Sequence, residues 1–204
     1  MNRRQILGLL LSLAAPATRA IEEKTGTWVA AMRRGEIFSI DAIMVAPVTP
    51  REAWDVLVDF DAWASFVPNM TSSRIVARQD NLIRVEQRGE LKWGPVTEPF
   101  STVREVHLTP PESMRSTSVA GATPREQSLT RFKEVPAGTE IWHRAEMVFE
   151  TWMPDRVAEV VLQKIMQERY EAMVAEMVRR RSASHTAPSG VSASSASQAS
   201  IAPW

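Results

Sequence analysis

The residue best suited to chemistry is a histidine on the expected covered face of a strand. Alternation places His143 on the same side as four apolar residues, namely Ile141, Ala145, Met147 and Phe149. An imidazole in such a place donates a hydrogen bond to a ligand carbonyl or acts as an acid or base. The alternative is a core histidine bonded to a neighbouring side chain or backbone group, which is the commoner arrangement for a buried polar group.

Two further polar residues raise a similar question. Arg104 shares its alternation with Phe100, Thr102, Val106 and Leu108. If that side faces inward, Arg104 is a buried cation that needs a carboxylate or an anionic ligand group as its partner. Alternatively, a slipped register at a bulge leaves Arg104 in water. Gln87, among apolar residues expected to face inward, either orients a polar head group or is a bonded core amide.

Other catalytic and metal-binding patterns are absent from the sequence. It contains no G-x-S-x-G, P-loop or G-x-G-x-x-G motif. It has no cysteine, which excludes thiol nucleophiles, disulfides and cysteine-ligated metals. Its three histidines, His107, His143 and His185, are not at metal-ligand spacing. We therefore expect no catalytic residue, metal or cofactor, and the formal net charge of zero gives no reason to expect a nucleic-acid partner.

The chain begins with the pattern of a secretory signal. Arg3 and Arg4 precede an apolar run at residues 6–16, and the small-residue segment Ala17-Thr18-Arg19-Ala20 follows. We predict a signal peptide over residues 1–20, cleaved near Ala20, and a periplasmic or secreted protein exported by the Sec or the twin-arginine route. The apolar run is too short to span a bilayer, so the mature chain is expected to make no stable membrane span and at most transient membrane contact. An N-terminal helix packed on the domain is the alternative.

The chain ends with a segment that is unsuited to forming a core. Residues 182–204 are mostly Ser, Ala, Pro and Gly, and such a segment buries too little apolar surface to offset its ordering entropy. We predict a disordered tail there and a single domain over residues 22–181. The overall composition, with 44% apolar and 24% charged residues, is ordinary for a globular domain.

The order of the expected elements indicates the fold class of this domain. Alternation and turn residues predict strands at residues 27–33, 37–45, 73–79, 83–93, 100–108, 113–120, 127–135 and 139–151. A capping box from Thr49 to Glu52, with Pro50 at the first helical position, starts a short helix. A second short helix begins at Phe60. A long helix is expected over residues 155–181, and the wide distribution of its apolar residues predicts a first half buried over most of its circumference.

These elements predict an α+β fold. Hairpin-connected strands form a curved antiparallel sheet wrapped on the long C-terminal helix, with the two short helices after the first strands. A sheet that curves around a helix leaves a space between them, which either side chains or a ligand fills.

Several segments of the chain carry a resemblance to a known superfamily. They are Ala46–Val48, Ala53–Asp61, Phe66–Met70, Val85–Gly89, Leu108–Pro111 and Gly138–Glu140, followed by the final helix. In their order and spacing they resemble the START-like (SRPBCC) superfamily of helix-grip proteins, in particular its polyketide cyclase/dehydrase and coenzyme Q-binding branch. The resemblance extends from about residue 27 to residue 181, and it implies lipid-like or polycyclic ligands, quinones among them. The superfamily includes binders, transporters and enzymes, so the fold by itself says little about chemistry.

The resemblance further implies a ligand cavity between the sheet and the final helix. We expect an exported binder or carrier of an apolar, lipid- or quinone-like small molecule. The residues expected to contact it are Trp63, Phe66, Met70, Val85, Gln87, Trp93, Phe100, Arg104, Phe132, His143, Met147, Phe149, Val157 and Val161. Two alternatives stay open. One is a cyclase-, aromatase- or dehydratase-type enzyme that polarises a carbonyl with His143 or Arg104, and the other is an interaction protein whose core is filled.

Overall fold

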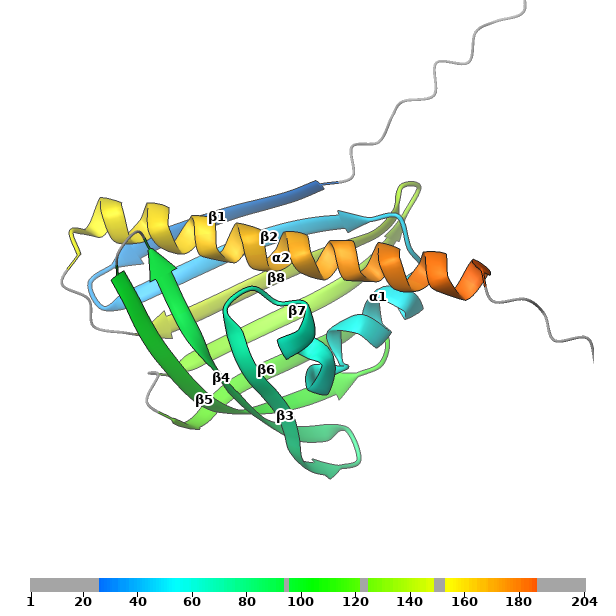
Figure 1. Cartoon of the computed structure of the whole chain (residues 1–204), viewed down its shortest axis with the longest axis horizontal. Coiled ribbons are helices and arrows are strands. Elements are labelled where there is room, and N and C mark those ends of the chain that lie inside the picture. Colours follow the sequence, from blue (N-terminus) through cyan, green and yellow to red (C-terminus); the bar gives the residue numbers. More distant parts are fainter. Residues whose placement is uncertain (1–25, 94–95, 122–124, 149–152, 187–204) are drawn as a thin grey trace, which may run out of the picture.

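The computed structural model of the chain describes residues 26–93, 96–121, 125–148 and 153–186 (Figure 1). The expected signal peptide lies outside the described residues, as does the expected tail from residue 187 onward.

The described strands form one curved antiparallel sheet. It contains β1 (Gly26–Arg34), β2 (Ile37–Ala46), β3 (Met70–Gln79), β4 (Leu82–Trp93), β5 (Val96–Thr109), β6 (Ser113–Gly121), β7 (Glu126–Val135) and β8 (Gly138–Val148). The order across the sheet is β1-β2-β8-β7-β6-β5-β4-β3, so the last strand returns to pair with β2. Each of the eight strands expected from the sequence is present.

Alternation along the strands decides which side chains reach the core. On β2, Phe38, Ile40, Ala42 and Met44 are fully buried, whereas Ile43 between them is exposed on the other side of the sheet. On β4, Ile83, Val85 and Gln87 are buried in the same way. The sheet therefore has one face against the core and one face in solvent, as its period of two predicts.

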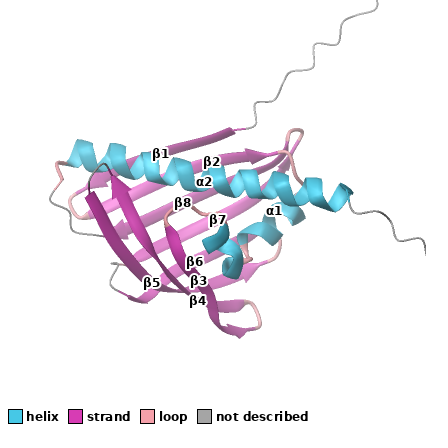
Figure 2. Cartoon of the chain, viewed as in Figure 1, coloured by secondary structure: helices cyan, strands magenta, loops and turns pink. Residues whose placement is uncertain are grey.

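The helices all lie on one face of the sheet (Figure 2). Helix α1 (Pro50–Leu57) begins with the expected capping box, because the Thr49 side chain accepts a bond from the Glu52 backbone N–H. In return the Glu52 carboxylate accepts from the Thr49 backbone N–H at 2.7 Å. The second short helix, η1 (Phe60–Ser65), is a 3-10 helix. Both short helices bury side chains in the core, Trp54 and Leu57 from α1 and Phe60 and Trp63 from η1.

The long helix α2 (Asp155–Thr186) runs across the concave face of the sheet (Figure 1). Its buried stripe includes Ala158, Leu162, Met166, Tyr170, Met173 and Met177, and it packs mainly against β1, β2 and α1. The expectation that its first half is buried nearly all round is wrong, since the side chain of Val160 is 67% exposed. A helix on a single sheet face buries one stripe only, and its opposite side stays in solvent.

The helix also continues five residues past Arg181, where the domain is expected from the sequence to end. The hydroxyls of Ser182 and Ser184 donate to the carbonyl oxygens of Val178 and Arg180 at 3.0 and 2.9 Å. These bonds satisfy polar side chains within the helix itself, so this first part of the serine-rich segment is helical.

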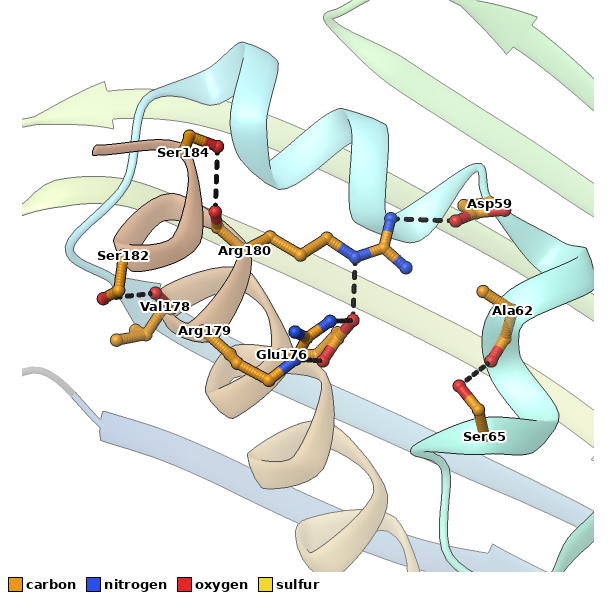
Figure 3. A network of polar contacts seen from close by, with 9 residues as sticks. All are labelled: Asp59, Ala62, Ser65, Glu176, Val178, Arg179, Arg180, Ser182 and Ser184. Atoms are coloured by element: carbon orange, nitrogen blue, oxygen red, sulfur yellow. Dashed lines mark hydrogen bonds and ion pairs between the residues drawn. The ribbon is translucent and has the colours of Figure 1, made fainter. Parts of the chain in front are cut away.

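Ion pairs fasten both ends of α2. At its start, Asp155 lies 2.9 Å from Arg33 of β1. At its end, the buried Glu176 carboxylate accepts bonds from Arg179 and Arg180, and Arg180 reaches on to Asp59 at 2.8 Å (Figure 3). The hydrogen bonds from Arg179, and then those from Arg180, lower the pKa of Glu176 to about 2 against the opposing effect of burial. The C-terminal half of the helix is thereby tied to the segment between α1 and η1.

We predict that Glu176→Gln lowers the free energy of unfolding by about 1–3 kcal/mol, because two guanidinium groups lose their charged acceptor. The folded-state pKa lies below the ordinary value of 4.5, so this contribution is present above about pH 4.5 and is lost as the pH falls toward about 2. Urea unfolding at neutral and acidic pH measures both effects.

The matched control is Glu168→Gln on the same helix, where Glu168 makes a looser, exposed pair with Lys164 at 3.9 Å. That pair should contribute less than about 0.5 kcal/mol. Equal losses for the two variants, or a Glu176 effect that persists at about pH 2, would contradict the anchoring role.

Candidate ligand cavity beneath the long helix

A small cavity lies between the concave face of the sheet and the helices. Its volume is about 50 Å³, which has room for water or a group of a few heavy atoms. Pockets that enclose whole small molecules are usually several times larger, about 300 Å³ or more. Side chains therefore fill most of the space between the sheet and the helices, and only this small cavity remains.

Residues from five strands and from all three described helices line the cavity. They are Met44, Leu57, Phe60, Trp63, Arg104, Val106, Met114, Ser116, Ser128, Thr130, His143, Tyr170 and Met173. Three of these are methionines, whose unbranched side chains change rotamer at low cost and adapt to irregular partners. The cavity therefore has an adaptable lining.

Arg104 faces inward, which answers the question left open by the sequence. Its side chain is 11% exposed, it donates to the Gln87 side-chain oxygen at 2.6 Å, and it lies 3.4 Å from the Glu126 carboxylate on β7. The register of β5 against β6 does shift between Val103 and Arg104, but the shift leaves Arg104 in the core. Gln87 is a bonded core amide, because its nitrogen also donates to Ser73 at 3.0 Å.

His143 is held from two sides. Its Nδ1 lies 2.9 Å from the Thr130 hydroxyl on β7, and its ring centroid lies 5.4 Å from that of Tyr170 on α2. Burial lowers the pKa of His143 to about 4, against the opposing effect of the Glu126 carboxylate. The imidazole is therefore neutral at about pH 7. Burial also raises the pKa of Tyr170, so its hydroxyl keeps its proton.

A second arginine approaches this region from the helix. The guanidinium of Arg169 lies over the ring of Phe100 at 5.8 Å, and burial lowers its pKa. The Glu126 carboxylate and the Arg104 charge both act on it, in opposite directions. Sequence alternation found Arg104 but missed Arg169, because helical periodicity alone does not reveal which strand a side chain will meet.

Several buried polar atoms here have no hydrogen-bond partner in the part of the chain that the structure describes. They are Trp63 Nε1, Arg104 Nε, Ser116 Oγ and Arg169 Nε. The first three belong to residues of the cavity wall. A buried donor without an acceptor costs about 1–3 kcal/mol, so these groups mark the cavity as a place suited to an acceptor from outside the chain.

The structure brings only some of the expected ligand residues together. Trp63, Arg104 and His143 line the cavity, and Gln87 supports Arg104 from behind. The remaining described ones lie elsewhere in or around the core: Phe66, Met70, Val85, Phe100, Phe132, Met147, Val157 and Val161. The side chains of Trp93 and Phe149 lie outside the described part.

The cavity residues that sequence reasoning missed include small polar ones. Ser116, Ser128 and Thr130 are buried and line the cavity from β6 and β7. Alternation along β6 and β7 could have predicted that these three residues face inward. The prediction was not made because inward positions are usually recognised by apolar residues, and these side chains are polar.

Within the described ranges, no group of three or more His, Asp or Glu side chains is arranged to hold a metal ion. The helices of the described segments also include none that is long and apolar enough to cross a membrane.

Comparison with known proteins agrees with this architecture. The sequence profile of the family "Polyketide cyclase / dehydrase and lipid transport" matches residues 46–174, more than half of the chain. A comparison with curated protein sequences gives no significant match.

Solved structures with the same fold are distant in sequence. The Zhui aromatase/cyclase from Streptomyces sp. R1128 is 13% identical, with a TM-score of 0.60 over 76% of this chain and 99% of that one. A STAR-related lipid transfer protein from Xanthomonas axonopodis is 11% identical, with a TM-score of 0.60 over 75% and 99% of the two chains. The protein TTHA0849 from Thermus thermophilus is 18% identical, with a TM-score of 0.59 over 72% and 98%.

At these low sequence identities, the structural similarity shows a shared fold only. The family profile, by contrast, matches the amino-acid sequence of this chain. The match over residues 46–174 shows that this chain belongs to the polyketide cyclase / dehydrase and lipid transport family.

Proposed function

We propose that this protein is an exported binder or carrier of an apolar, lipid- or quinone-like small molecule, which it holds between the sheet and α2. The observation that carries the proposal is a cavity whose wall includes three methionines and two N–H groups, of Trp63 and Arg104, that have no acceptor among the described residues. Such a lining combines apolar surface for the body of a ligand with donors that orient its polar end.

The cavity must enlarge to enclose a whole ligand. Met44, Met114 and Met173 line it from two strands and the helix, so rotamer changes there widen it without breaking backbone hydrogen bonds. Burial of ligand surface stabilises the enlarged state by about 25 cal/mol per Å², before the costs of association.

The family description also supports binding of this class of molecule, since it names lipid transport beside polyketide cyclisation. The rival proposal is a cyclase-, aromatase- or dehydratase-type enzyme that polarises a carbonyl with His143 or Arg104. Both side chains line the same cavity, so the two proposals share a site and differ in what His143 does there.

We predict saturable, one-to-one binding of the neutral apolar probe N-phenyl-1-naphthylamine, measured by its fluorescence. Ser116→Val replaces an unpartnered cavity hydroxyl by a bulkier apolar group, and it should weaken probe binding by about fivefold or more. The control is Thr117→Val, on the outward side of the same strand, which should leave binding unchanged.

Native mass spectrometry of the protein purified from its own host complements this measurement, since a carrier should retain an apolar compound. No saturable probe binding together with no retained compound would leave the filled-core interaction protein as the better proposal.

We predict that His143→Ala changes probe affinity by less than about threefold and that binding by the unmodified protein is constant between about pH 6 and pH 8. The reason is that the pKa of His143 is about 4, so the residue carries no charge in that range. An enzyme would instead lose turnover of a carbonyl substrate in the His143→Ala variant while keeping its affinity, and that result would favour the rival.

Export is proposed from the N-terminal pattern alone. We predict that expression of the full chain in a Gram-negative host gives a periplasmic protein whose N-terminal sequence starts at Ile21. Replacing Arg3 and Arg4 by lysine should block export if the twin-arginine route is used and should have little effect on the Sec route. A cytoplasmic product that retains residues 1–20 would refute the proposal.

A further inference from the structure

The cavity is walled by buried residues, so a whole ligand reaches it only when part of the wall moves. All of its lining residues except His143 are buried. On the sheet side, the five strands that line it, β2, β8, β7, β6 and β5, are consecutive neighbours joined by backbone hydrogen bonds. A ligand that passed between two of these strands would break several bonds and leave buried backbone groups unpaired. The entry route is therefore expected on the side of the helices.

The first half of α2 is attached to the edge of the sheet. The Gln167 side-chain nitrogen donates to the carbonyl oxygen of Thr27 on β1 at 2.9 Å. The backbone N–H of Arg33, on the same strand, donates to the Glu159 carboxylate at 2.8 Å. Lifting this half of the helix would expose backbone groups of an edge strand as well as apolar surface. This part of the wall is therefore poorly suited to opening.

The remaining part of the wall lies between η1 and the second half of α2. Phe60 and Trp63 line the cavity from η1, whereas Tyr170 and Met173 line it from α2. We call the contact between these two elements the η1–α2 seam. The backbone of η1 packs against β3, at the far edge of the sheet, rather than against α2. The cavity thus borders both sides of a seam that backbone packing holds only weakly.

An ion pair at the end of α2 spans this seam. Arg180 of α2 lies 2.8 Å from the carboxylate of Asp59, the residue that immediately precedes η1 (Figure 3). The buried Glu176 carboxylate holds the Arg180 guanidinium in place from behind at 2.7 Å. The side chains of Arg180 and Asp59 are 31% and 41% exposed, so water replaces the contact at low cost when they separate. Their separation breaks no hydrogen bond of the sheet.

We propose, as an inference that rests on the function proposed above, that the η1–α2 seam is the entry route of the ligand and that the Arg180–Asp59 ion pair holds it closed. When the pair separates, η1 and the second half of α2 move apart and expose the cavity between them. Neither Arg180 nor Asp59 lines the cavity. The pair therefore controls how fast a ligand enters and leaves, and not how tightly it is bound.

The test is the exchange rate of N-phenyl-1-naphthylamine, followed by stopped-flow fluorescence in the unmodified protein and in Asp59→Asn. This variant keeps the shape of the side chain and loses the charge that holds Arg180. We expect the association and dissociation rate constants both to rise about fivefold, with the dissociation constant unchanged within about twofold. Both rates rise together because the open state becomes more populated with and without ligand.

The matched control is Asp155→Asn, which removes the ion pair with Arg33 at the other end of the same helix. It should leave both rate constants unchanged, because it lies away from the seam. Raising the salt concentration from about 0.01 M to about 1 M screens exposed ion pairs. Exchange should therefore become faster with salt in the unmodified protein and in Asp155→Asn, but stay nearly constant in Asp59→Asn.

A cross-link tests the same seam in the opposite direction. The chain contains no cysteine, so Asp59→Cys combined with Arg180→Cys gives a single pair that a short bis-maleimide joins. We expect probe exchange in the cross-linked protein to slow by about tenfold or more. The control pair, Thr27→Cys with Gln167→Cys, joins β1 to the first half of α2 and should leave exchange unchanged.

The outcomes separate the entry route from the proposed function. Unchanged rate constants in Asp59→Asn, an equal rise in Asp155→Asn, or free exchange in the protein cross-linked at residues 59 and 180 would overturn the entry route and leave the binding proposal intact. If Asp59→Asn does not fold, the cross-linked pair decides. Absence of saturable probe binding by the unmodified protein would overturn the proposed function itself.

Discussion

The constraint on which this structure depends is the need to cover the concave face of a curved sheet with a single helix. The stripe that includes Leu162, Met166 and Met173 buries against that face, and ion pairs at Asp155 and Glu176 hold the two ends of the helix in place. Because the helix approaches β1, β2 and α1 most closely, the strands farther across the sheet lie farther from it. The cavity beside Tyr170 and Met173 lies between these strands and the helix.

The polar groups around that cavity follow from the same geometry. Strand alternation turns Arg104, Ser116 and Thr130 toward the helix, and the helix places the Arg169 guanidinium over the Phe100 ring of β5. A core selected only for stability would fill these positions with apolar side chains, since buried charges and unpartnered donors cost free energy. Around the cavity, buried polar groups stand where apolar side chains would pack better. Local exceptions to stable packing of this kind are expected at binding sites.

Much of the fold was predictable because its signals are local. The alternation in β2 and β4 and the capping box at Thr49 depend on neighbours within a few residues, so the strands and α1 appeared in the sequence with nearly correct bounds. Predictions about exposure were less accurate. Val160 looked buried because apolar residues surround it in the sequence, yet it is exposed, since the helix has a partner on one side only.

The sequence by itself determined the order of elements, the family resemblance and the alternation along β5. These features depend on the spacing of apolar residues and on turn residues, which are local properties of the sequence. Only the tertiary structure decided that Arg104 faces the core and contacts both Gln87 and Glu126. It also decided that Arg169, from the distant helix α2, lies over the Phe100 ring of β5, and that the remaining cavity is small. These features depend on distances between segments far apart in the chain, and on how closely side chains of particular shapes fit together, which no local pattern records.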